Sequence, residues 1–105
     1  MKHDINREKL RSTLLSMASM FETGRIKRMR DLTPMYPTGI VAALGINYGG
    51  YMTKCASPEK FVIADLIKLS QILDIDVEFI LRVVIKEAQQ NVNPKDISHL
   101  LNGEG

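Results

Sequence analysis

The sequence is poor in the residues that build covalent or metal-bound frameworks. Its 105 residues include one cysteine, Cys55, and no tryptophan. A single cysteine excludes an internal disulfide and a structural zinc cluster of cysteines, and we expect this thiol to be buried and inert. The two histidines, His3 and His99, are distant in sequence and lack metal-ligand spacing. We therefore expect no metal ion and no other cofactor.

Long apolar runs and catalytic constellations are missing as well. No segment reaches the roughly 18 apolar residues of a membrane span, and residues 1–6 lack the apolar core of a signal peptide. Spacing suggests no His/Asp or Cys/His pair, and no glycine-rich phosphate loop occurs. Together with the unpaired cysteine, these absences predict a cytoplasmic protein with no membrane partner, no evident small-molecule ligand and no enzymatic activity.

The composition that remains is that of an ordinary globular chain, with 45% hydrophobic and 25% charged residues. Apolar residues recur at spacings of three and four, and strand alternation appears nowhere convincingly. We therefore expect one all-α domain over residues 1–105, a bundle of five to six helices. It divides into an N-terminal helical extension (1–24), a core (25–90), and a short C-terminal helix with a tail (91–105).

The apolar spacing predicts helices at residues 5–22, 25–32, 37–44, 48–55, 77–90 and from 62 or 63 to 73. Asp4, Asn47 and Asp76 are expected to cap three of them, and Gly45 to end one in the left-handed conformation. A short helix through residues 97–101 and a frayed tail complete the chain. In the last two long helices, we expect these side chains to face inward: Ile63, Leu66, Ile67, Leu69, Leu73, Ile80, Leu81, Val84, Ile85 and Ala88.

Charge is unevenly distributed along the chain. The formal net charge is +2, but residues 1–54 hold nine Lys/Arg against four Asp/Glu, and residues 55–105 hold five against eight. Much of the basic excess lies on the predicted helix 25–32, at Arg25, Lys27, Arg28 and Arg30. Such a cluster favours a polyanionic partner, with contacts to a phosphate backbone. A solvated helix face without a partner is the alternative.

Residues 38–55 carry the pattern with the clearest functional meaning. A helix-turn-helix needs a small residue where its helices cross, which Ala42 or Ala43 supplies, and a glycine in the turn, which Gly45 supplies. Ile46 can plug the core beneath the turn, and Asn47 can cap the second helix. The first residues of such a second helix are the ones that approach base edges in a major groove.

The runs Ile40-Val41-Ala42-Ala43-Leu44-Gly45-Ile46-Asn47, Met52-Thr53-Lys54, Ser57-Pro58 and Leu66 to Asp76 resemble the phage repressor/Cro-like (XRE-type) helix-turn-helix family. About forty residues carry this resemblance. It implies a five-helix domain that binds double-stranded DNA, commonly as a dimer. The family often has Thr-Gln at the start of its first motif helix, where this chain has Thr38-Gly39.

Carried over by position, the resemblance implies that Tyr51 or Met52 is buried. The implied base-edge contacts are Asn47, Tyr48, Gly49, Gly50 and Thr53. The candidate phosphate contacts are Arg25, Lys27, Arg28, Arg30, Thr38, Lys54 and Lys60. Two of these residues have plain alternatives, since Tyr48 could pack over the motif or an interface and Lys54 could be a solvated surface residue.

The main hypothesis is a transcriptional regulator that binds duplex DNA through this motif. The alternative is a protein-interaction module that has the helix-turn-helix fold without sequence-specific base readout, which the bare Gly49 and Gly50 favour. We also expect a homodimer, because the apolar arcs of the predicted helices 5–22 and 77–90 need burial partners and a two-fold dimer would place two motifs about one DNA turn apart.

Overall fold

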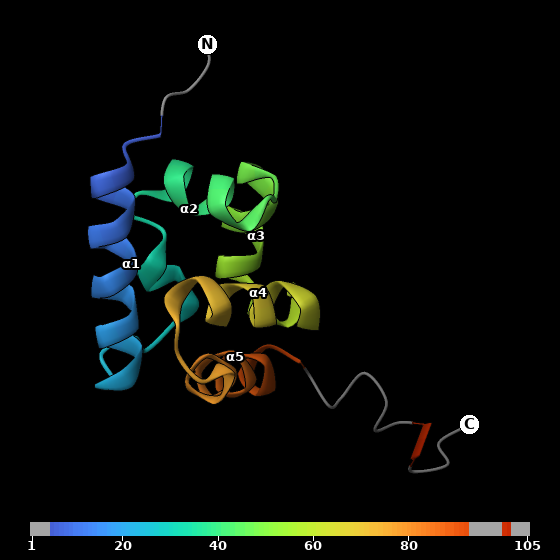
Figure 1. Ribbon diagram of the computed structural model, residues 1–105. Coiled ribbons are helices and arrows are strands. Elements are labelled where there is room, and N and C mark those ends of the chain that lie inside the picture. Colours follow the sequence, from blue (N-terminus) through green and yellow to red (C-terminus); the bar gives the residue numbers. More distant parts are fainter. Residues whose placement is uncertain (1–4, 93–99, 102–105) are drawn as a thin grey trace.

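The computed structural model describes residues 5–92 and 100–101. Within these ranges no strand occurs, and the regular elements are five α-helices and two short 3-10 helices. In chain order they are α1 (Arg7–Glu22), η1 (Met29–Leu32), α2 (Pro37–Leu44), α3 (Tyr48–Ala56), η2 (Pro58–Lys60), α4 (Ile63–Leu73) and α5 (Val77–Asn91) (Figure 1). The all-α prediction is confirmed for this part of the chain.

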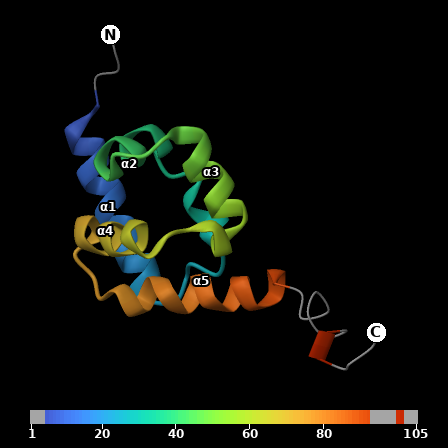
Figure 2. The same cartoon turned by 90° about the vertical axis from the view of Figure 1, so that its right-hand side faces the viewer.

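The helices enclose one core. In Figure 1, α1 stands along one side, α2 and the start of α3 lie at the upper end, α4 crosses the middle, and α5 lies below. Figure 2 shows the same order, with α5 running beneath the other helices. All five α-helices and η1 contribute to the buried apolar cluster, which comprises Met17, Phe21, Ile26, Met29, Leu32, Ile40, Leu44, Tyr51, Cys55, Leu66, Leu69, Leu73, Ile80 and Val84.

Three helix ends have the polar or glycine residue that their geometry needs. The Asn47 side chain caps α3 and the Asp76 side chain caps α5, as predicted. Gly45 ends α2 with a φ of 70°, a conformation that costs little for glycine.

The predicted cap Asp4 is wrong, because the Asn6 side chain accepts a hydrogen bond from the Lys9 amide at 2.9 Å. The first helix therefore begins at Arg7, two residues later than predicted, and Asp4 lies outside the described residues.

The predicted helix at 25–32 is also wrong. Only η1 forms, and the backbone amides of Lys27 and Arg28 both donate to Asp31 Oδ2, at 3.0 and 3.1 Å. These bonds hold the preceding stretch in a non-helical path. Ile26, Met29 and Leu32, whose spacing suggested a helix, are nevertheless all buried. The periodicity thus identified the inward residues, while a side chain that competes for backbone amides determined the conformation.

The apolar stripe of α4 and α5 is narrower than predicted. Leu66, Leu69, Leu73, Ile80 and Val84 are buried as expected, and Leu81 and Ala88 are half-buried. Three predicted core residues are wrong, since Ile63, Ile67 and Ile85 are 64%, 43% and 51% exposed. The α4 and α5 helices pack on each other, and their contact leaves one apolar flank of each uncovered.

The remaining predictions concern the second 3-10 element and the C-terminus. The expected loop between α3 and α4 contains η2. Leu100 and Leu101 are helical and exposed, while the rest of the predicted C-terminal helix and tail, at 93–99 and 102–105, lies outside the described residues. Among the helices that the structure describes, none is long and apolar enough to cross a membrane.

Candidate nucleic-acid interface

The α2–α3 unit is built around a tight turn. The Gly45 amide donates to the Val41 carbonyl at 2.8 Å, and the Ile46 amide donates to the same oxygen at 3.2 Å. The Asn47 Oδ1 then accepts from the Gly50 amide at 2.8 Å, which starts α3. Ile46 itself is half-buried beneath the turn. These bonds use the backbone groups that helix ends leave free, so the two helices are held at a fixed angle.

Two polar contacts with α4 hold this unit in place. Lys68 Nζ donates to the Leu44 carbonyl at 3.0 Å, where α2 ends. Lys54 of α3 pairs with Asp65 of α4 at 2.9 Å, and both side chains are half-buried, with 28% and 13% of their surface exposed. Lys54 was a candidate phosphate contact. In the structure its ammonium is already bonded within the fold, so it joins α3 to α4.

The start of α2 is fixed by Tyr36, which has a φ of 46°. A Cβ added to Gly39 would overlap the Tyr36 ring, so only glycine fits this position while the ring stays in place. The Tyr36 hydroxyl accepts a hydrogen bond from the Asn6 amide at 2.9 Å, and Lys9 Nζ lies 4.5 Å from the ring centroid. Glycine at position 39 therefore has a packing reason, and the same ring joins the start of α1 to the start of α2.

The outer face of α3 carries most of the base-edge candidates. Asn47, Tyr48, Gly49 and Thr53 are exposed, and Gly50 is half-buried. Tyr51 takes the inward position and Met52 is half-buried, which decides between the two residues that the sequence left open. The structure thus places four of the five candidates on α3 and Asn47 at its N-cap, with Tyr48 as the only aromatic side chain among them.

Gly49 and Gly50 leave α3 without side chains at its second and third residues. A Cβ added to Gly49 would lie 3.2 Å from Asn47 Oδ1, and one added to Gly50 would lie 3.8 Å from the same atom. Neither glycine has a positive φ. Glycine inside a helix costs about 1 kcal/mol relative to alanine. Gly50 therefore lowers the stability of α3 without a visible packing gain, whereas a Cβ at Gly49 would press on the Asn47 oxygen that caps the helix.

The four-cation cluster is exposed, but it lies away from the starts of α2 and α3. Arg25, Lys27, Arg28 and Arg30 are all exposed, and none forms an ion pair with another residue in the described ranges. Figure 1 shows the stretch between α1 and η1 at the end of the molecule near α5, whereas α2 and the first turn of α3 lie at the opposite end. Of the cluster, only Arg30 belongs to an element, η1, that packs against α3.

Two phosphate candidates remain, Thr38 and Lys60, and the structure adds a third cationic or polar residue that the sequence did not indicate, Lys9. Thr38 is exposed in the first turn of α2, and Lys60 is exposed on η2. Lys9 was not predicted, yet it lies beside Tyr36 and hence beside the start of α2. The prediction of a helix at residues 5–22 could place Lys9 on the outer face of that helix, but it could not place Lys9 next to α2. That proximity depends on Tyr36, whose backbone is in the left-handed conformation.

The buried polar groups of α3 offer no reactive centre. The Tyr51 hydroxyl makes no hydrogen bond to any described residue and lies beside the Cys55 thiol. Burial raises the pKa of Tyr51 above its ordinary value and raises the pKa of Cys55 to about 11. The thiol is therefore protonated at neutral pH, and only its thiolate would be nucleophilic. Nor does any group of three His, Cys, Asp or Glu in the described part of the chain form a candidate metal site.

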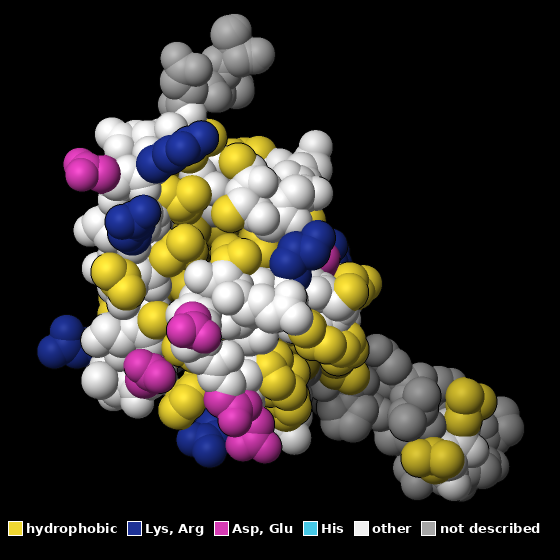
Figure 3. Space-filling view, viewed as in Figure 1, with side chains coloured by type: hydrophobic (Ala, Val, Ile, Leu, Met, Phe, Trp, Pro, Cys, Tyr) yellow, Lys and Arg dark blue, Asp and Glu magenta, His cyan; other side chains and the backbone are white. Residues whose placement is uncertain are grey.

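The face seen in Figure 3 shows Lys and Arg side chains scattered as separate groups, with apolar side chains between them. It contains no continuous basic surface. Comparison with protein-family models, with curated proteins and with solved structures finds no match to this chain. The geometry of α2 and α3 is therefore the basis on which a function can be argued.

Proposed function

We propose that this protein binds duplex DNA, as a transcriptional regulator, with α2 and α3 acting as a helix-turn-helix. One observation carries the proposal. A glycine-turned, asparagine-capped pair of short helices buries Tyr51 and Cys55 on one side of α3 and leaves Gly49 and Thr53 exposed on the other, with Tyr48 exposed at the first residue of the helix. An exposed start of the second helix is what a major groove can receive.

The available side chains suggest a mode of contact with few base-specific bonds. The Oδ1 of Asn47 already accepts from the Gly50 amide, and its Nδ2 can donate to a base acceptor. The Thr53 methyl fits apolar contact with a thymine methyl, and its hydroxyl can donate or accept. Tyr48 can bond a phosphate or base edge through its hydroxyl. Glycines 49 and 50 let the α3 backbone approach the bases closely.

Phosphate contacts would come chiefly from the end of the molecule where α2 and α3 begin. Thr38 lies in the first turn of α2, where Pro37 has no N–H and the Gly39 amide donates to the Tyr36 carbonyl, so Thr38 itself would supply the contact, through its amide or its hydroxyl. Lys9 lies at the same end of the molecule, through its contact with the Tyr36 ring. The cluster at Arg25, Lys27 and Arg28 would add mainly long-range attraction. Lys54 would contribute little, because it is paired with Asp65.

The test is the salt dependence of binding to a mixed-sequence labelled duplex. Phosphate contacts require the affinity to fall linearly with salt on a log–log scale, by about one unit of slope per phosphate neutralised. The paired change Tyr48→Ala and Thr53→Ala should reduce preference among duplexes in a random pool, and wild-type protein should select a motif. Absence of binding at low salt would overturn the proposal.

A second candidate function is a protein-interaction module that uses the same fold without reading bases. The observation that favours it is the small number of long polar side chains on the outer face of α3, where Lys54 is already paired. Binding to DNA that is weak, salt-sensitive and identical for every duplex, with no change in the Tyr48 and Thr53 variant, would support this candidate.

A further inference from the structure

The outer face of α1 carries a ridge with a hollow on each side. Arg7, Arg11 and Leu15 follow one another along α1 at intervals of one turn, and all three are exposed, Leu15 by 68%. One hollow, of about 400 Å³, lies between α1 and the end of α4. The other, of about 360 Å³, lies between the second half of α1 and Arg25. Leu15 lines both hollows, so it stands between them.

Apolar side chains line both hollows. Leu10, Leu14 and Ile72 line the first and Met20 lines the second, and all four are half-buried. In Figure 3, hydrophobic side chains lie between α1 and α4, and Lys or Arg side chains lie over the upper part of α1. Contiguous apolar surface with polar groups at its edge is a mark of an interaction site.

The cations beside the hollows have no neutralising partner in the described part of the chain. Arg7 and Arg11 line the first hollow and Arg25 lines the second, and none of these three forms an ion pair with a described residue. Like charges one turn apart on a helix repel each other. These three arginines, the arginine rim, face one carboxylate among the described lining residues, that of Asp74. A partner with apolar and acidic side chains would complement this face.

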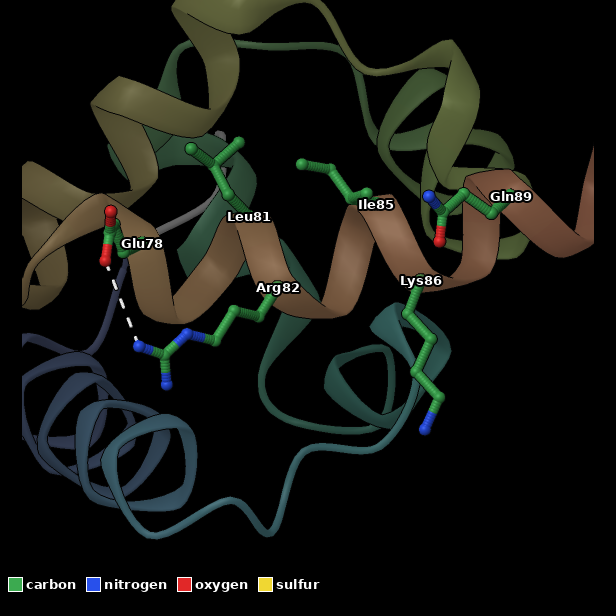
Figure 4. A pocket seen from close by; sticks show the side chains of 6 residues that line it. All are labelled: Glu78, Leu81, Arg82, Ile85, Lys86 and Gln89. Carbon is green, nitrogen blue, oxygen red and sulfur yellow. Dashed lines mark ion pairs between the residues drawn. The ribbon is translucent and has the colours of Figure 1, made fainter.

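A hollow on the outer side of α5 lacks this arrangement. Its volume is about 380 Å³. Figure 4 shows Arg82 turned toward Glu78, with which it forms an ion pair of 3.9 Å. The same view shows Leu81 and Ile85 on one side of the helix and Arg82 and Lys86 on the other. One cation there is thus already paired, and the apolar side chains point away from the cations. This part of α5 is therefore the natural comparison for α1.

We propose that the outer face of α1 binds an amphipathic helix of another protein that has acidic residues beside its apolar stripe. A ridge between two grooves is the form in which one helix receives another. The hollows lie about two turns apart along α1, roughly 10 Å, which is the spacing of residues i and i+7 on a partner helix. Apolar side chains at these positions enter the hollows on either side of Leu15, and carboxylates beside them pair with Arg7 and Arg11.

The same observations distinguish this partner from a second copy of the chain and from duplex DNA. A two-fold interface brings a patch against itself, so a second copy would set the arginine rim against another arginine rim. A duplex offers phosphates to the arginines but no apolar side chains for the hollows. The face lies on elements other than α2 and α3. This inference therefore does not depend on the proposed DNA binding, and either can fail without the other.

The first experiment titrates the ¹⁵N-labelled full chain, without DNA, with two synthetic peptides of about 15 residues, a length at which a helix can form. One is a leucine-striped helix flanked by glutamates, and the other has a lysine in place of every glutamate. The glutamate peptide should shift the amides of α1 and of the end of α4. It should bind at least about tenfold more tightly than the lysine peptide, because its charge complements the arginine rim.

A pair of single variants locates the binding site. Leu15→Asp should weaken binding of the glutamate peptide by at least about tenfold, because it places a carboxylate between the two hollows. Ile85→Asp is the matched control, since Ile85 is 51% exposed on α5 and away from α1. It should leave the binding unchanged. Circular dichroism confirms that each variant remains helical.

A pair of double variants tests the role of charge. Arg7→Glu with Arg11→Glu should reverse the preference, so that the lysine peptide binds more tightly than the glutamate peptide. Arg82→Glu with Lys86→Glu makes the same change of net charge on α5 and should keep the preference of the wild type. This comparison separates pairing at the arginine rim from the overall charge of the protein.

Four results would overturn the inference. Three are the absence of amide shifts on α1 at millimolar glutamate peptide, equal affinities for the two peptides, and equal losses for Leu15→Asp and Ile85→Asp. The fourth comes from sedimentation equilibrium without peptide. A wild-type dimer that Leu15→Asp dissociates and Ile85→Asp does not would assign the outer face of α1 to a second copy of the chain.

Discussion

This molecule has two basic regions, residues 25–30 and Lys9, and the one nearer to α2 in sequence lies farther from the start of α2 in the fold. The cations at 25–30 immediately precede α2 in sequence, yet Figure 1 shows the stretch between α1 and η1 near α5. Lys9 lies far upstream of α2 in sequence, yet it sits against Tyr36, where α2 begins. For a surface that would contact DNA, the distant residue is the better placed one.

The difference has identifiable causes. The Lys27 and Arg28 amides bond to Asp31, and the Met29 amide donates to Glu87 Oε2 of α5 at 2.6 Å. Residues 25–30 are thus bonded to α5 before the chain turns toward α2. Lys9 is held near the start of α2 by the Tyr36 ring. Proximity in sequence therefore says little about which cations share a face with α3.

The largest effect expected is that of Tyr36→Ala, which breaks the link between α1 and α2. It removes ring packing, the hydrogen bond from the Asn6 amide and the Lys9 contact. We expect a loss of about 2 to 3 kcal/mol in the free energy of unfolding, from urea denaturation. Tyr36→Phe keeps the ring and should lose only about 1 kcal/mol.

Gly39→Ala provides an internal check on that prediction. In the wild type the new methyl group meets the Tyr36 ring and should destabilise the fold, whereas in the Tyr36→Ala background this overlap is gone. The two changes should therefore cost clearly less together than the sum of the single changes. Strict additivity would mean that the ring does not hold this position.

An intermediate effect should distinguish the two basic regions in DNA binding. Lys9→Gln should weaken duplex binding by about tenfold at low salt and lower the salt slope by about one unit, since it removes one cation beside α2. Lys27→Gln, which removes one cation from the first region, should have a smaller effect on both quantities. Lys9→Arg is the control that keeps the charge near Tyr36. Equal losses for the two glutamine variants would contradict the account.

The smallest effect concerns the stability of α3. Gly50→Ala adds a methyl group that meets Asn47 only at ordinary contact distance. It should raise the free energy of unfolding by about 0.5 to 1 kcal/mol, because alanine favours a helix over glycine. Thermal unfolding measures this change, and Gly45→Ala, at a positive φ, is the contrasting variant that should destabilise. A destabilised Gly50→Ala would show that this glycine has a role within the fold.

The sequence predicted the parts of this structure that depend on local chemistry. Asn47 and Asp76 cap their helices because their side chains bond amides within three residues. Gly45 ends α2 because glycine tolerates positive φ. Helix periodicity likewise identified most of the buried side chains.

The parts it missed depend on contacts between distant segments. The spacing of Ile26, Met29 and Leu32 fits a helix and the observed path equally, so only Asp31 and Glu87 distinguish them. Which flank of α4 is covered depends on how α5 crosses it, and therefore Ile63 and Ile67 were wrongly placed in the core. The position of Lys9 required the Tyr36 ring.

Titration of ¹⁵N-labelled protein with a duplex, followed by amide chemical shifts, tests the central claim most directly. The account predicts that the largest changes fall on residues 47–53 and on Thr38, with smaller ones at Lys9 and little change at residues 25–28. Changes confined to residues 25–30, or none at any duplex concentration at low salt, would contradict the claim that α2 and α3 form the DNA-binding surface.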